Sequence, residues 1–105
     1  MPKSAIFRYS EEQQVTVTRS AYRNGNGIVP ALIGTMPDGD EYAVFSIYIV
    51  QQAHLLKPNQ TFIKTYSEGE GNLEVLQAAG IVGPVLFEVQ TGFVTVPAVE
   101  VLIED

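Results

Sequence analysis

The amino-acid sequence predicts a single α+β domain spanning residues 1–105, with about five to six mostly antiparallel strands and a single helix packed on one face of the sheet. Three observations support this fold class. Apolar runs with strand periodicity recur between clusters of turn residues, the connections between them are short enough for antiparallel neighbours, and only one segment has helical periodicity. A chain of this length with 46% hydrophobic residues can bury one core.

The first predicted strands form a hairpin. Residues 14–20 alternate apolar and hydroxyl side chains with period two, as a half-buried strand does. Residues 24–27 have the sequence NGNG, which tolerates positive φ, and residues 28–35 are predicted to be the returning strand. Pro30 has no amide hydrogen, so we expect it at a bulge, an edge or a strand start, with less regular pairing than the turn suggests.

The strongest strand pattern covers residues 42–50 and follows a predicted turn at residues 37–40. One side of this strand is wholly apolar and is predicted to face the core: Ala43, Phe45, Ile47 and Ile49. The other side is amphipathic and carries two phenols: Tyr42, Val44, Ser46, Tyr48 and Val50. Residues 51–59 are predicted to form a connection, and residues 61–66 a short strand.

The helical pattern follows that strand. Ser67 and Glu70 have the spacing of a capping box, in which a hydroxyl and a carboxylate bind the first free amides of a helix. Leu76 lies in the apolar stripe, and Gly80 is placed to end the helix in the left-handed conformation, with Ile81 folding back on Leu76. Strands are predicted over residues 85–90 and 93–103, and three side chains of the second should face inward: Val99, Val101 and Ile103.

Composition excludes several classes of function. Because the chain has no cysteine, it cannot form disulfides, thiolate metal sites or cysteine nucleophiles. A formal net charge of −6 disfavours direct binding to nucleic acid and favours basic partner surfaces. Charged residues interrupt the first eight positions, so we expect no secretory signal there, and no apolar run approaches the ~20 residues of a membrane span. The expected location is the cytoplasm, with no membrane partner.

No residue set in the sequence predicts catalysis, a cofactor or a metal. His54 is the only histidine and lies in a polar connection, which is typical of a solvated loop residue. The glycine-containing loop at residues 67–71 precedes the helix, but Glu68 and Glu70 would repel a phosphate. The carboxylates at positions 38, 40 and 41 lack the spacing of a calcium loop and suit a solvated turn. We therefore assign no catalytic, cofactor-binding or metal-binding residue.

Four short blocks and one proline carry a resemblance to a known family: DGDEYAV at residues 38–44, FIKTYSEGEG at 62–71, AGIV at 79–82, TGFV at 91–94, and Pro97. Through these blocks the chain resembles an uncharacterised family of small bacterial domains carried on integrative and conjugative elements and on phages. The resemblance implies a similar fold and a phage or mobile-element origin. No activity is assigned to that family, so it implies no functional residue.

The aromatic residues of the central strand give the functional hypothesis. If one helix cannot cover both faces of the sheet, the phenols form an exposed interface, and if the sheet curls they are buried. The predicted interface comprises Tyr42, Val44, Tyr48, Val50, Glu68 and Glu70. We expect a non-enzymatic module that occludes a host or element-encoded protein, in its most concrete form an inhibitor of a CRISPR-type or restriction defence complex. The alternatives are a self-associating homodimer and a small ligand-binding protein or enzyme.

Overall fold

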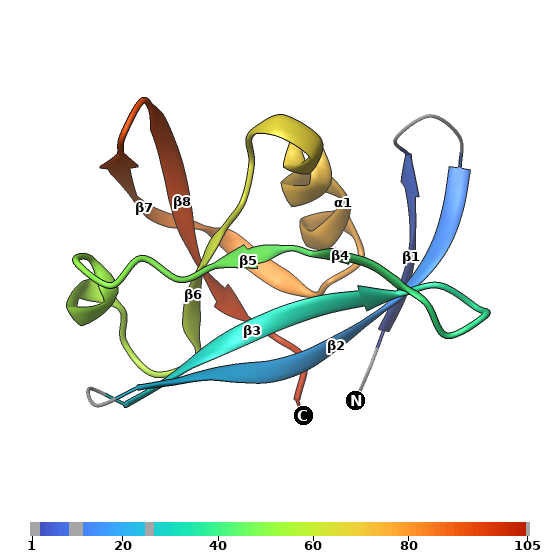
Figure 1. Cartoon of the computed structure of the whole chain (residues 1–105), viewed down its shortest axis with the longest axis horizontal. Helices are drawn as coiled ribbons and strands as arrows, with labels where there is room; N and C mark the ends of the chain where they lie inside the picture. Colours follow the sequence, from blue (N-terminus) through green and yellow to red (C-terminus); the bar gives the residue numbers. More distant parts are fainter. Residues whose placement is uncertain (1–2, 9–11, 25–26, 105) are drawn as a thin grey trace.

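The computed structural model describes residues 3–8, 12–24 and 27–104, and over these residues it contains eight strands, one α-helix and two short 3₁₀ turns (Figure 1). The strands are β1 Lys3–Arg8, β2 Glu12–Asn24, β3 Gly27–Thr35, β4 Glu41–Val44, β5 Ser46–Ile47, β6 Gln60–Ile63, β7 Val82–Thr91 and β8 Val94–Val101. The helical elements are η1 Ala53–Leu55, η2 Ser67–Gly69 and α1 Asn72–Ala78.

The predicted fold class is confirmed, but the number of strands is higher than expected. Every strand pair is antiparallel, and one α-helix accompanies the sheets within the described residues. The first difference is β1, which forms where we predicted no strand. The second is that residues 42–50 contain two short strands, β4 and β5, instead of one long strand.

The strands form two four-stranded sheets that meet at Phe45. Sheet A has the order β1-β2-β3-β4, and sheet B has the order β5-β6-β8-β7. The Phe45 N–H donates to the Leu32 carbonyl oxygen of sheet A at 2.8 Å, and the Phe45 carbonyl accepts from the Lys64 N–H beside sheet B at 2.9 Å. Helix α1 contacts β1 and β7, the strands at the far ends of the two sheets (Figure 1). The two sheets and the helix therefore enclose a common core.

The β2–β3 hairpin agrees with the sequence prediction, although residues 25 and 26 of its turn lie outside the described residues. The irregular pairing expected at Pro30 is wrong, because Pro30 pairs with Ala21 in a register that is continuous along β3. Leu32, two residues further along, points its N–H away from β2 to the Ser46 hydroxyl at 3.0 Å. Residues two apart in a strand have the same orientation, so the backbone nitrogen of Pro30 also faces away from β2. Its missing N–H therefore costs the β2–β3 ladder no hydrogen bond.

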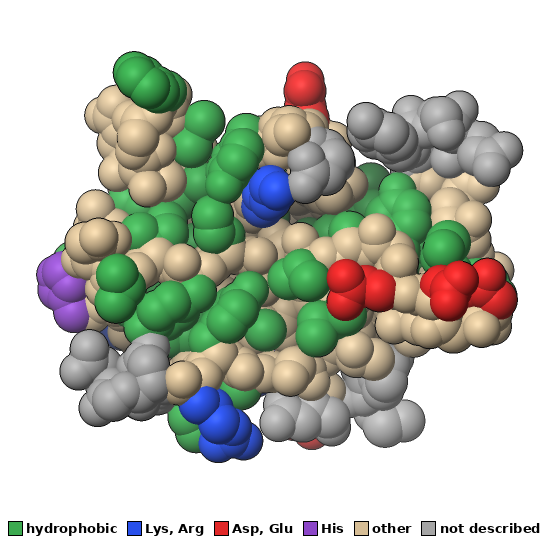
Figure 2. Space-filling model, viewed as in Figure 1, with side chains coloured by type: hydrophobic (Ala, Val, Ile, Leu, Met, Phe, Trp, Pro, Cys, Tyr) green, Lys and Arg blue, Asp and Glu red, His purple; other side chains and the backbone are tan. Residues whose placement is uncertain are grey.

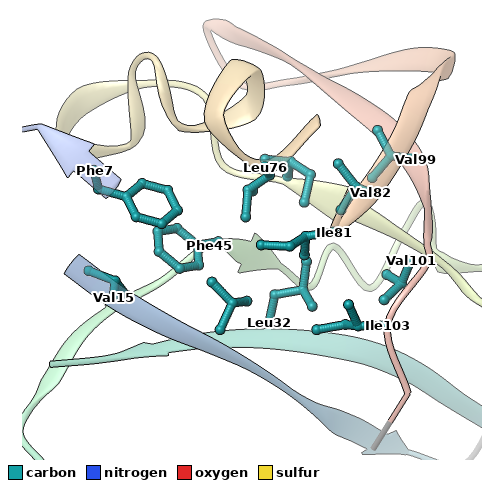
Figure 3. Close-up of a cluster of buried hydrophobic side chains, with 12 residues drawn as sticks. Phe7, Val15, Leu32, Phe45, Leu76, Ile81, Val82, Val99, Val101 and Ile103 are labelled. Atoms are coloured by element: carbon teal, nitrogen blue, oxygen red, sulfur yellow. The ribbon is translucent and has the colours of Figure 1, made fainter. Parts of the chain in front are cut away.

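One hydrophobic core lies between the sheets and the helix (Figure 3). Its fully or almost fully buried side chains are Phe7, Val15, Val17, Leu32, Phe45, Ile63, Leu76, Ile81, Val82, Val99, Val101 and Ile103. The rings of Phe7 and Phe45 stack with their centroids 4.7 Å apart. The predicted inward orientation of three residues near the end of β8 is confirmed, since all three belong to this cluster.

The predicted capping box at Ser67 is wrong. Ser67 has a φ of 57° and opens the short turn η2, whereas α1 begins after Gly71, which has a φ of 86°. A capping serine needs an extended backbone so that its hydroxyl can reach the amides of the first turn. The left-handed backbone of Ser67 does not provide that geometry. The helix instead starts at the buried Asn72, five residues after Ser67.

The predicted end of the helix is confirmed. Gly80 has a φ of 73°, its N–H donates to the Gln77 carbonyl at 3.1 Å, and the Ile81 N–H donates to the Leu76 carbonyl at 2.9 Å. These two bonds define a Schellman ending. The Lys3 ammonium also donates to the Ala79 carbonyl at 3.3 Å, which ties β1 to the negative end of the helix.

Candidate protein-interaction surface

The chain passes from sheet A to sheet B at Phe45, and this crossing divides the interface that we predicted from the sequence. Tyr42 and Val44 lie on β4 in sheet A, while Tyr48 and Val50 follow β5 of sheet B. The predicted single strand would have placed all four side chains on one face. Because the chain changes sheet between them, they do not form one continuous row.

Tyr42 is half-buried at the end of the core. Its ring lies 5.9 Å from the ring of Phe7 and 6.3 Å from that of Phe45, centroid to centroid. Burial raises the pKa of the Tyr42 phenol above its usual value. Val44 is 40% exposed and pairs with Ile33 on the neighbouring strand. On this side of the crossing, the phenol therefore belongs to the core and the valine to the surface.

Tyr48 packs against a second tyrosine that the sequence hypothesis did not include. The ring centroids of Tyr48 and Tyr22 are 5.5 Å apart. The Tyr22 hydroxyl lies 2.9 Å from the hydroxyl of Ser46, which is buried and also accepts the Leu32 N–H. These bonds fasten the β2–β3 hairpin to β5, so Tyr48 covers a polar junction between the sheets.

The other face of sheet B carries a second hydrophobic cluster, which we call the sheet B face. Four of its side chains are buried: Ile49, Phe62, Val96 and Ala98. Six more are only partly buried: Ile47, Leu56, Tyr66, Phe87, Val89 and Val94. In the main core the fully covered side chains outnumber the partly covered ones, whereas here the proportion is reversed. The sheet B face is therefore an apolar surface that its own chain covers incompletely.

Three exposed apolar side chains directly adjoin members of this cluster in the sequence. Val50 is 60% exposed, and Leu55 of η1 is also exposed. Phe93, in the turn between β7 and β8, is fully exposed. Figure 2 shows hydrophobic side chains gathered over β5, over the segment that follows it and beside the β7–β8 hairpin, with the surface hollowed between the hairpin and the loop that contains η2. Apolar patches of this kind are common at protein interfaces.

The loop that contains η2 borders the sheet B face. Lys64 lies above the ring of Tyr66, with its ammonium 5.4 Å from the ring centroid, as in a cation–π contact. Glu70 is exposed at the end of this loop, and the side chain of Glu68 lies outside the described residues. Of the six predicted interface residues, the structure thus brings Val50 and Glu70 to exposed positions on the segments that flank this face.

The polar residues that we considered as candidate catalytic or metal-binding groups do not form one site in the described residues. His54 is exposed on η1, and the Asp38 carboxylate accepts the Asp40 N–H at 2.9 Å within the β3–β4 turn. Among the described residues, no group of three or more histidine and acidic side chains is arranged to hold a metal ion. No helix in the described part of the chain is long and apolar enough to cross a membrane.

Sequence reasoning missed the contribution of β7 and its turn to this surface. Phe87 lies on β7, 6.2 Å from Phe62 in an edge-to-face contact, and Phe93 follows Gly92 in a two-residue turn. An aromatic residue in a turn was the available signal, because such a position has few neighbours of its own chain. No protein-family model matches the sequence, and no curated protein or solved structure is significantly similar to it.

Proposed function

We propose that the protein is a non-enzymatic binding module that acts by covering a surface of a host protein. The observation that supports this proposal is the incompletely covered sheet B face with exposed Val50, Leu55 and Phe93 beside it. Interface centres are rich in aromatic and apolar side chains and poor in charge, as this face is. The net charge of −6 favours a partner whose binding surface has a basic rim.

The most concrete form of the proposal is inhibition of a bacterial defence complex of the CRISPR or restriction type. The family resemblance supports it, since a phage or mobile element gains from blocking such a complex. Occlusion requires no reaction, only a surface that excludes the complex's normal partner. An apolar interface should also lose little affinity in high salt, whereas binding through surface carboxylates alone would weaken strongly.

The test uses bacterial strains that each carry one defence system and express the chain. The measurement is the plating efficiency of a phage that the system restricts. The wild-type chain should raise plating in at least one strain, and Val50→Asp with Leu55→Asp should lower that rise by about tenfold or more, because each places a charge in the interface. Leu102→Asp is the matched control, since Leu102 is 52% exposed and its neighbours in the sequence belong to the main core instead of the sheet B cluster.

Two results would count against the proposal. One is the absence of any rise in plating across the defence strains. The other is a double variant that remains as active as the wild-type chain while circular dichroism shows both to be folded. Where a strain responds, titration calorimetry with its purified defence complex at low and high salt then separates apolar occlusion from charge-driven binding.

A further inference from the structure

The free edge of sheet B is β7, and its two halves differ. Near its start the register with β8 shifts between Val82 and Val85 and again between Val85 and Phe87. Bulges of this kind, together with Pro84, hinder strand addition. From Phe87 to Thr91 the register is regular, and no strand of the described sheet lies on the outer side of β7. This second half is a regularly paired edge with no further strand beside it in the described sheet.

The backbone of this edge is oriented to accept a strand. Glu88 is paired with Pro97, which has no N–H, so this pair does not exchange hydrogen bonds. The N–H and carbonyl of Glu88 therefore point away from β8, toward the free edge. Because orientation repeats every two residues, the N–H and carbonyl of Gln90 point the same way. Two residues thus offer two donors and two acceptors at the edge.

The β7–β8 hairpin is apolar and almost uncharged. Glu88 is the only charged residue between positions 82 and 99. Val85 and Leu86, at the second bulge, are both more than two-fifths exposed, and Phe93 at the turn is fully exposed. Figure 1 shows the hairpin projecting from the rest of the molecule. A surface with so little charge is unsuited to select a strongly charged partner.

We propose that this edge binds a second copy of the chain, with β7 pairing antiparallel to β7 of the partner subunit. A two-fold axis perpendicular to the sheet passes midway between the two β7 strands, so that Val89 faces Val89 of the partner subunit. Glu88 then lies opposite Gln90 of the partner subunit and exchanges two backbone hydrogen bonds with it, and the symmetric pair adds two more. The two copies together form one sheet of eight strands.

This register is favoured because it satisfies three features of the hairpin at once. It uses the regular half of β7 and leaves the bulges outside the paired segment. It avoids the neighbouring register, in which Glu88 would lie opposite Glu88 of the partner subunit. Two like charges in that position would destabilise the pair. It also brings the β7–β8 turn of the partner subunit, with its exposed Phe93, toward the bulge that carries exposed Val85 and Leu86.

Cysteine crosslinking tests the register directly, because the natural chain contains no cysteine. Residues in a pair that exchanges no hydrogen bonds have Cα atoms about 4.5 Å apart, within the ~4.4–6.8 Å range of disulfides. Val89→Cys should therefore crosslink rapidly to a disulfide-bonded dimer under mild oxidation. Glu88→Cys, the matched control on the neighbouring residue, should crosslink slowly, because its counterpart lies two residues away along the partner strand.

Sedimentation of the unmodified protein over a concentration series tests the association without any substitution in the strand. The mass should rise from monomer to dimer, and Phe93→Asp should raise the dissociation constant about tenfold or more while leaving the circular dichroism spectrum unchanged. A monomer at all concentrations would overturn the proposal, as would equal crosslinking at positions 88 and 89, or a dimer that Phe93→Asp leaves intact. Each of these results is independent of the plating assay, so the binding function and the self-association can fail separately.

Discussion

Replacing Gly34 by alanine tests the central packing feature of the fold. A Cβ atom on Gly34 would lie 2.6 Å from Cε2 of Phe45 and 2.7 Å from Cγ1 of Val15, and both of those side chains are buried. The Phe45 ring has little freedom to move away, because it stacks on Phe7 and its backbone is hydrogen-bonded to both sheets. Overpacking of this kind costs about 1–3 kcal/mol.

A second effect of the same substitution acts in the opposite direction. Alanine in a strand is favoured over glycine by roughly 0.5–1 kcal/mol, because the unfolded chain loses less entropy on folding. The expected net change for Gly34→Ala is therefore a loss of about 1 kcal/mol of unfolding free energy, within a range of about 0–2.5 kcal/mol. Gly83→Ala carries the second effect without the first, since its nearest atom is a carbonyl oxygen 4.0 Å away and its φ is not left-handed.

Urea denaturation followed by circular dichroism measures both variants. We expect a lower midpoint for Gly34→Ala, an unchanged or higher midpoint for Gly83→Ala, and the same slope for each, because the area exposed on unfolding does not change. Adding Phe45→Leu to Gly34→Ala should recover part of the loss, which a double-mutant cycle detects as a coupling. If Gly34→Ala proves as stable as Gly83→Ala, the close contact between Gly34 and the Phe45 ring is refuted.

Three further predictions concern single side chains. Ser46→Ala should lower the free energy of unfolding by about 1–3 kcal/mol, because the Leu32 N–H loses its acceptor, and urea denaturation would show it. Gly80→Ala should cost roughly 1–2 kcal/mol in the same assay, because alanine disfavours the left-handed backbone that ends α1. The raised pKa of Tyr42 means that the folded state favours the neutral phenol, so stability should be lost as the pH rises above 10.0, and less so in Tyr42→Phe. Urea midpoints at neutral and alkaline pH measure that difference.

The features that the sequence predicted correctly depend on local signals. The end of α1 is one, because glycine in a left-handed conformation followed by an isoleucine is a pattern contained within a few residues. The inward alternation near the end of β8 is another, since Val99 and Val101 follow the two-residue period of a strand. The β2–β3 hairpin also follows from its turn sequence. Each of these depends little on what the rest of the chain does.

The start of the helix could not be predicted in the same way. Ser67 and Glu70 have the spacing of a cap, but the chain between them packs closely against the segment just before it. A Cβ atom on Gly69 would collide with the Lys64 carbonyl oxygen, so the backbone folds tightly against the preceding segment. That close approach requires glycine at position 69, and Ser67 in the same turn has a left-handed backbone. The capping pattern considers only the residue types at positions 67 and 70, so it cannot predict this contact.

The exposed surface differs from the one predicted over residues 42–50 because the chain changes sheet there, and Ser46 marks the point of change. Period two predicts that residues 42–50 keep one face outward, which is true only while the strand stays in one sheet. The ladder between β3 and β4 ends at Ile33 and Val44, and the next amide, that of Leu32, would lack a strand partner. The Ser46 hydroxyl accepts that amide. A serine in the middle of an apolar strand thus marks the point where a side chain replaces the backbone ladder and the chain enters the second sheet.

This change of sheet determines which side chains are available to a partner. On the sheet A side of the crossing, the Tyr42 ring joins the core through Phe7 and Phe45. On the sheet B side, β5 contributes only two residues, and the segment after it covers the cluster around Phe62 incompletely. The same crossing that completes the main core therefore leaves the second cluster half-covered. If the chain binds another protein, the physical reason is that its strands bury one face of sheet B fully and the other only in part.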